Sequence, residues 1–475
     1  MNPSEPQAVS KPLLHPDATE AATVLSGRRA KTSGSGWRHA RTAPSLPEVY
    51  SSIRVPPGAS RWRKIVAFAG PGLMVAVGYM DPGNWATDLA GGARFGYTLL
   101  SVILISNFMA ILLQHLALKL GIATGRDLAQ ACRDHYSRPV ALTLWVLCEV
   151  AIAACDLAEV IGSAIALNLL FGIPLVIGVC ITAMDVLIVL FLQHKGFRML
   201  ECIVAVLIVT IGACFAYNLI YAQPPLVAVM AGLIPHTQIV ANPEMLYIAI
   251  GILGATVMPH NLYLHSSIVQ TRAFNRDDAG QAMAIRYATI DSTASLLSAF
   301  FINAAILILA AVAFHGTEHE NVADIGDAYK LLSPVMGVPL ASTLFAVALL
   351  ASGQNSTLTG TLAGQIVMEG FLNIRLRPWL RRLITRLIAI GPAVVVAGLY
   401  GEQGVGRLLI LSQVILSLQL SFAVVPLVWF TGEKKKMGVF TNSTWLAAVS
   451  WFVTVVIIGL NGYLLVQTFA EWSRG

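Results

Sequence analysis

The chain has 475 residues, of which 56% are hydrophobic and only 12% are charged, and its mean hydropathy is +0.70. A soluble globular domain does not need this much apolar side chain, whereas a protein that crosses a membrane many times does. The six cysteines lie in or beside apolar stretches without a Cys-x-x-Cys pair. They are typical of small buried side chains, and this excludes a disulfide framework or a zinc-binding module.

Residues 1–60 contain no apolar run and are rich in proline, serine, alanine and arginine. A secretory signal needs a hydrophobic core of about seven or more residues, so this class of targeting segment is excluded. The composition predicts a disordered cytoplasmic tail. A transit peptide is the alternative, and it is disfavoured by the acidic residues Glu5, Asp17, Glu20 and Glu48.

The remainder, residues 61–475, is predicted to be one all-α polytopic membrane domain with eleven hydrophobic segments. Most are long enough to cross a hydrocarbon core of about 30 Å at about 1.5 Å per residue. The segments are approximately 65–94, 97–121, 139–171, 173–193, 199–221, 244–271, 284–314, 334–372, 382–400, 404–430 and 444–470.

The basic residues predict the orientation of these segments. With the N-terminus in the cytoplasm, 27 of the 31 lysines and arginines fall on the cytoplasmic side. This asymmetry is a strong positive-inside signal, and eleven crossings then place the C-terminus outside. The formal net charge of +6 is therefore explained by topology and implies no nucleic-acid partner.

The first and sixth segments are interrupted by glycine and proline, and they stand five helices apart. Segments one to five and six to ten would then have opposite orientations, which is the pattern of an inverted repeat. We place repeat one at about 65–221, repeat two at about 244–430 and an extra helix at about 444–470. Interrupted segments at corresponding positions of two halves are typical of a transporter's binding site.

Each interruption places a metal-binding side chain directly before a proline. Asp81 precedes Pro82, and Met258 precedes Pro259. Each proline lacks the N–H that would pair with the carbonyl four residues earlier, and it disfavours the helical conformation of the residue before it. A bound cation could satisfy the freed carbonyls, which are costly in hydrocarbon.

Five candidate metal ligands follow: the side chains of Asp81, Asn84 and Met258, and the carbonyls of Gly78 and Ala255. Oxygen ligands suit Mg²⁺, Ca²⁺ or Mn²⁺, whereas a thioether favours softer ions, so the mixed set favours Mn²⁺, Fe²⁺ and later first-row metals. The alternative is a pair of structural kinks, which are common in membrane helices. An aspartate inside the membrane argues against it, because such a residue is costly and usually functional.

The stretches 81–84 and 258–260 resemble the signature motifs of the Nramp divalent-metal transporters, also called MntH or DMT. The resemblance extends from about residue 70 to 463 and includes 91–97, 156–159 and 411–416. It implies a LeuT-type fold, with helices 1 and 6 unwound in the middle, and proton-coupled import of Mn²⁺ or Fe²⁺. It also adds Gln413 to the metal ligands. The family often has alanine at the position of Gly78, and its pattern lacks the long N-terminal tail.

Three carboxylates on the third segment, Glu149, Asp156 and Glu159, share one helical face and predict a proton relay. The alternative is that they pair with arginines of a neighbouring helix, and Arg381 and Arg382 are candidates for that role. The resemblance implies that Asp156 and Glu159 form the proton exit route with these arginines as partners.

Asp81 is expected to couple metal arrival to proton release, and His260 is a further candidate for the proton pathway. Asn107, Thr256 and Asn303 are candidates for supporting or gating positions. Their side chains are polar, although the segments that carry them are apolar.

These features predict a secondary active transporter that imports Mn²⁺ and Fe²⁺ with protons by alternating access, in a bacterial inner membrane. Its partners would be the metal ions, protons and the lipid bilayer. We expect no cofactor, no enzymatic activity and a functional monomer. A magnesium carrier, a sodium-coupled carrier of organic solutes and a signalling protein are alternatives. Met258 disfavours the magnesium carrier, and the pairing of Asp81 with Met258 disfavours the carrier of organic solutes. The short stretch after Leu460 disfavours the signalling protein.

Overall fold

The computed structural model describes residues 36–40, 44–46, 53–55, 58, 60–182, 184, 197–320, 325–374 and 378–472. Helices dominate these residues, and the two short strands form a single parallel pair. The first half contains β1 (Ile53–Arg54), α2 (Arg61–Phe68), α3 (Pro71–Gly78), α4 (Pro82–Phe95), α5 (Leu100–Thr124), α6 (Leu128–His135), α7 (Arg138–Phe171), α8 (Leu175–Thr182) and α10 (Phe197–Ala222).

The second half begins with short helices outside the main bundle and then repeats the pattern of a broken helix followed by long ones. Its elements are α11 (Leu226–Gly232), α12 (Gln238–Ala241), α13 (Pro243–Thr256), α14 (Pro259–Ile268), η1 (Val269–Thr271), β2 (Arg272–Ala273), α15 (Asp278–Phe314), α16 (Ile325–Met336), α17 (Ala341–Leu372), α18 (Pro378–Gly432), α19 (Lys434–Met437), η2 (Gly438–Phe440) and α20 (Thr444–Trp472).

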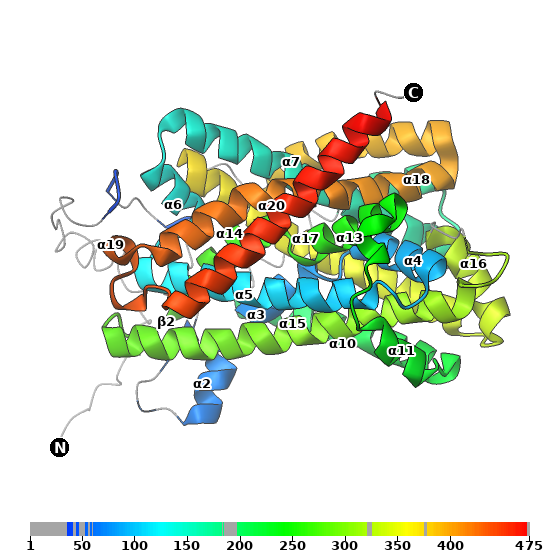
Figure 1. The fold of residues 1–475 in the computed structure, drawn as a ribbon, viewed down its shortest axis with the longest axis horizontal. Coiled ribbons are helices and arrows are strands. Elements are labelled where there is room, and N and C mark those ends of the chain that lie inside the picture. The colour runs from blue at the N-terminus through cyan, green and yellow to red at the C-terminus, as the bar shows by residue number, and fades with distance from the viewer. Residues whose placement is uncertain are drawn as a thin grey trace, which may run out of the picture.

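The observed helices correspond to the predicted hydrophobic segments. Within the described residues, seven helices are long and apolar enough to cross a membrane. The first predicted segment covers the last residues of α2 together with α3 and α4, and the sixth is divided into α13 and α14. The breaks before α4 and α14 fall at the predicted prolines, whereas the break between α2 and α3 was not predicted. The fourth segment is described only as far as α8 and residue 184. The ninth and tenth lie together in α18, whose ribbon doubles back on itself (Figure 1).

The broken helices lie at the centre of the protein. In the stretch Pro243–Thr271, 94% of the most apolar window is buried inside the protein, against 33% for Thr444–Val466 of α20. Figure 1 shows α20 running diagonally across the front of the bundle, and it packs against α18 and α13. The broken helices are therefore shielded by protein, which non-helical backbone at membrane depth requires.

Parts of the predicted disordered tail are packed against the bundle. Ile53 of β1 pairs with Arg272 of β2. Trp37 is 7% exposed, packs edge-to-face against Phe430 and lies under the guanidinium of Arg126. Ser45 donates a hydrogen bond to the Asp127 carboxylate. The prediction of disorder is therefore wrong for these residues. Composition missed these contacts because they involve a two-residue strand and two isolated side chains in a polar stretch.

Candidate metal site

The first break is a tight turn between α3 and α4. The amides of Tyr79 and Met80 bond to the carbonyls of Ala76 and Val77, three residues earlier, at 3.1 and 3.0 Å. Asp81 then adopts an extended conformation (φ −70°, ψ 165°) and caps α4. Its Oδ1 accepts a hydrogen bond from the Asn84 amide at 2.9 Å. This is the conformation expected for a residue before proline and for an aspartate at a helix N-terminus.

Side chains from other elements satisfy the carbonyls that follow Gly78. Asn303 Nδ2 on α15 donates to the Tyr79 carbonyl at 2.7 Å. The Met80 carbonyl accepts from Trp85 Nε1 and from the Ser352 hydroxyl on α17. Across the described ranges, no hydrogen-bond donor is found for the Gly78 carbonyl. That oxygen is therefore available to a ligand, as the missing N–H of Pro82 predicts.

The second break is held mainly by its own backbone. The Val257 amide bonds to the Leu253 carbonyl at 2.9 Å, and α14 starts at Pro259. Met258 caps α14 with φ −29° and ψ 118° and makes no side-chain hydrogen bond to it. Its carbonyl accepts from the Asn261 amide at 3.2 Å. Pro259 leaves the Ala255 carbonyl without its usual helical donor.

The two breaks face each other at Gly78. A methyl group on Gly78 would lie 3.1 Å from Met258 Sδ and 2.2 Å from Asn261 Nδ2. Asn261 also donates to the Val75 carbonyl of α3 at 3.4 Å. The thioether of Met258 is therefore placed next to the end of α3, beside the carbonyl that the first break exposes.

Gln413 of α18 lies between the two breaks. A methyl group on Gly83 would lie 1.7 Å from Gln413 Nε2 of the side chain. A methyl group on Gly254 would lie 2.2 Å from the backbone carbonyl oxygen of Gln413. Glycine at position 83 is needed for this close approach, because any larger residue would displace the amide. The structure thus brings Gln413 to the same place as the ligands predicted from the two breaks.

The side chains that could coordinate a metal at this site are buried, and two of their oxygen atoms have no hydrogen-bond partner. Asp81, Met258 and Gln413 are 0% exposed and Asn84 is 1% exposed. Asn84 Oδ1 and Gln413 Oε1 accept no hydrogen bond from any described residue. An unpaired buried acceptor costs about 1–3 kcal/mol, and a cation between the breaks would remove this cost. The groups that could coordinate the metal are mostly amide, thioether and carbonyl groups. The described residues contain no cluster of three His, Cys, Asp or Glu side chains.

A cysteine connects this site to the carboxylates of α7. Cys155 Sγ lies 3.8 Å from Asp81 Oδ2 and 3.8 Å from Glu159 Oε1. Glu159 Oε2 also accepts from the Thr357 hydroxyl of α17 at 3.4 Å. Sequence reasoning treated Cys155 only as an apolar residue. The sequence signal for its role was its position one helical turn before Glu159, which places both side chains on one face.

The other predicted proton-pathway residues differ in their burial. Asp156 is buried at 0% exposure, and His260 at 3%. Glu149 is only half-buried and accepts a hydrogen bond from Trp145 Nε1 at 3.1 Å. It stands ten residues before Glu159, about 15 Å along the helix. The side chains of Arg381 and Arg382 lie outside the described part of the structure, so their predicted pairing stays a prediction.

Asp88 of α4 is a further buried carboxylate that the sequence reasoning did not select. It is 1% exposed, and its Oδ2 has no partner among the described residues. Its spacing of seven residues from Asp81 places both on one face of the chain. The available signal was an acidic residue inside an apolar segment.

Comparisons with known proteins identify the family of this chain. Residues 72–467 match the Nramp family, described as "Natural resistance-associated macrophage protein-like". The divalent metal cation transporter MntH of Listeria innocua is 64% identical over 447 residues, which cover 94% of this chain and 100% of that protein. MntH of a Nostoc species is 63% identical and covers 90% of this chain and 97% of its own length.

Solved structures show the same fold. A manganese transporter of Eremococcus coleocola, crystallised with an aromatic bis-isothiourea substituted compound, has a TM-score of 0.82 and 43% identity, covering 88% of this chain and 90% of its own. Mhp1, a nucleobase-cation-symport-1 family transporter, has a TM-score of 0.57 at 16% identity, covering 86% and 92%. The latter likeness shows the LeuT-type fold alone. The chain belongs to the Nramp family and is an all-helical, multi-pass membrane transporter, not an enzyme.

Proposed function

We propose that this protein imports Mn²⁺ and Fe²⁺ across the bacterial cell membrane by proton symport and alternating access. The observation that carries the proposal is the group of buried donors between the two breaks, with the unpartnered oxygens of Asn84 and Gln413. The names of its relatives, MntH in Listeria innocua and a manganese transporter in Eremococcus coleocola, support a divalent metal cation as the substrate.

The ligand chemistry supports first-row transition metals. Asp81 supplies the charged oxygen, Asn84 and Gln413 supply amide oxygens, and the carbonyls of Gly78 and Ala255 complete the hard donors. Met258 contributes a soft thioether, which offers little to Mg²⁺ or Ca²⁺ but binds Mn²⁺, Fe²⁺ and their neighbours. Discrimination against the abundant hard cations would then reside largely in one sulfur atom.

Proton movement would start at Asp81 and continue along α7. When the metal binds, its charge favours the ionised carboxylate of Asp81, so a proton bound there is released. The contacts of Cys155 with Asp81 and Glu159 support transfer toward α7. Asp156 and Glu149 on the same helical face would carry the proton on, with Arg381 and Arg382 as partners and His260 beside the break.

The proposed orientation follows the distribution of lysine and arginine, with the N-terminus in the cytoplasm and the C-terminus outside. Both breaks and the intervening Gln413 come from a single chain. The proposed unit of transport is therefore a monomer.

A proteoliposome assay tests the proposal. The full chain is reconstituted with a pH dye inside, and uptake of Mn²⁺, Fe²⁺, Ca²⁺ and Mg²⁺ is measured with an inward proton gradient. We expect Mn²⁺ and Fe²⁺ to enter together with internal acidification, while Ca²⁺ and Mg²⁺ enter far more slowly. Mn²⁺ entry without acidification would disprove the coupling, and equal uptake of all four ions would disprove the proposed selectivity.

A further inference from the structure

The short helix α2 has the character of a membrane-surface helix. Trp62 is 77% exposed and Val66 is 56% exposed, and they stand one turn apart on the same face. Arg61, Arg63 and Lys64 accompany them in the same eight residues. Exposed apolar side chains beside basic ones are typical of helices that lie at the interface between lipid and water.

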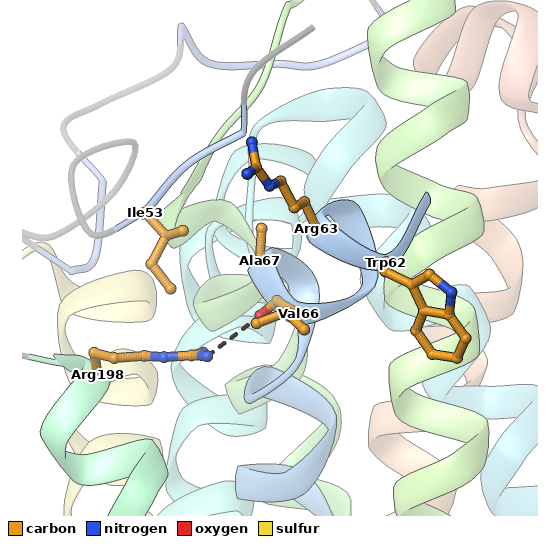
Figure 2. A pocket seen from close by; sticks show the side chains of 6 residues that line it. All are labelled: Ile53, Trp62, Arg63, Val66, Ala67 and Arg198. Carbon is orange, nitrogen blue, oxygen red and sulfur yellow. Dashed lines mark hydrogen bonds between the residues drawn. The ribbon is translucent and has the colours of Figure 1, made fainter. Parts of the chain in front are cut away.

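A pocket of about 490 Å³ opens beside this helix. It is lined by Ile53 of β1, by Trp62, Arg63, Val66 and Ala67 of α2, and by Arg198 of α10. Figure 2 shows Arg198 extending from α10 toward the backbone of Val66, while Arg63 and Trp62 leave α2 on different sides. Two guanidinium groups and four apolar side chains thus share one open cavity.

The charge of this pocket is not neutralised by the protein alone. No carboxylate in the described ranges pairs with Arg63. Arg198 pairs with Glu201 at 2.9 Å, but its side chain is still 44% exposed. Arginine has five N–H donors in a fixed fork that suits phosphate, and the apolar lining suits the first carbons of an acyl chain.

Arg198, which lines the pocket, also holds the backbone that leads into α3, the first half of the first broken helix. Arg198 donates to the carbonyls of Ala69 and Val66 at 2.7 and 3.3 Å. Arg272, fully buried and paired with Glu201 at 2.7 Å, donates to the carbonyl of Ala69 as well, at 3.0 Å. Ala69 lies two residues before α3, so a ligand on Arg198 would act directly on the link between α2 and α3.

We propose that this pocket binds the phosphate headgroup of an anionic phospholipid, and that the bound lipid stabilises the docked position of α2 and α3. Arg63 and Arg198 hold the phosphate, and Trp62 and Val66 contact the acyl region. The positive-inside distribution places this end of the bundle at the cytoplasmic leaflet, where anionic headgroups attract basic residues. A ligand that favours one arrangement of α3 shifts the transporter toward that arrangement.

Lipid binding is measured without reference to transport, so its outcome is separate from that of the proposed function. The purified full chain is titrated with phosphatidylglycerol or phosphatidylcholine, and retained lipid is counted by native mass spectrometry. We expect Arg63→Gln to weaken phosphatidylglycerol binding about fivefold, equivalent to about 1 kcal/mol for one basic residue near the headgroup. Arg63→Lys should restore much of the binding, because it keeps the charge.

Arg138→Gln is the matched control, since Arg138 is an exposed arginine at the start of α7 and does not line the pocket. It should bind phosphatidylglycerol like the wild type. The thermal midpoint of the wild type should rise more with phosphatidylglycerol than with phosphatidylcholine, and Arg63→Gln should lose that difference. Unchanged lipid retention in Arg63→Gln would overturn the proposal. So would equal stabilisation by soluble glycerol phosphate, which would indicate a site for free anions.

Discussion

At the first break, side chains from α15, α17 and α4 itself bond to the carbonyls of Tyr79 and Met80, and the Asp81 side chain caps the following helix. At the second break, Met258 caps α14 without any side-chain hydrogen bond. The loose backbone of the first break is therefore held by neighbouring helices, while the second is positioned by the close approach of Met258 and Asn261 to Gly78 and by the hydrogen bond from Asn261 to the Val75 carbonyl.

This difference matches the chemistry of the two proposed ligands, Asp81 and Met258. A carboxylate inside a membrane must be held in one orientation, because a misplaced charge is costly. A thioether is neutral and weakly polar, so packing alone is enough to place it. We infer that the first break provides the affinity for a dication and the second break adjusts which dication is preferred.

The largest effect is expected from Asp81→Asn. Asparagine is as good a helix cap as aspartate, so the substitution removes the charge and keeps the turn. Mn²⁺ uptake should fall by about 100-fold or more, because a lost charged contact costs about 3 kcal/mol or more. Proteoliposome uptake and a Mn²⁺ titration by calorimetry measure the change.

Asp277→Asn is its matched control. Asp277 caps α15 through the Gly280 amide at 3.0 Å, in the same way that Asp81 caps α4, but it is exposed and belongs to neither break. It should transport Mn²⁺ like the wild type. Near-normal uptake by Asp81→Asn would show that the carboxylate is not a ligand.

A smaller effect, confined to selectivity, is expected from Met258→Leu. The two side chains have similar volumes, so the packing at Gly78 is retained while the sulfur is lost. The preference for Mn²⁺ over Ca²⁺ should decrease by about tenfold, the equivalent of about 1.4 kcal/mol. Competition of Ca²⁺ against Mn²⁺ uptake measures it, with Met368→Leu on α17 as the control. An unchanged preference would remove the thioether from the site.

The last comparison concerns stability and tests the supports of the two breaks. Asn303→Leu leaves the Tyr79 carbonyl unpaired and should destabilise the protein by about 1–3 kcal/mol. Thr256→Val removes a bond to Ile252, whose carbonyl sits inside a regular helix, and should cost about 0.5 kcal/mol. Thermal unfolding in detergent measures both. A larger loss in Thr256→Val would reverse the comparison between the breaks.

Much of the architecture could be predicted from the order of residues. A long apolar segment must form a helix in lipid, since every backbone polar group needs an internal partner. A proline at the middle of such a segment must free a carbonyl. These two local rules placed the spans and both breaks, and they proposed Asp81, Asn84 and Met258 before any contact between distant segments was known.

Only the tertiary structure decided which distant residues join those breaks. The approach of Gln413 to Gly83, the position of Cys155 between Asp81 and Glu159, and the support from Asn303 and Ser352 depend on helix packing. The docking of Trp37 and Ser45 in a polar tail likewise depends on partners more than 80 residues away. Hydrophobic pattern and proline chemistry act within a few residues, whereas these contacts depend on the rotation and depth of whole helices.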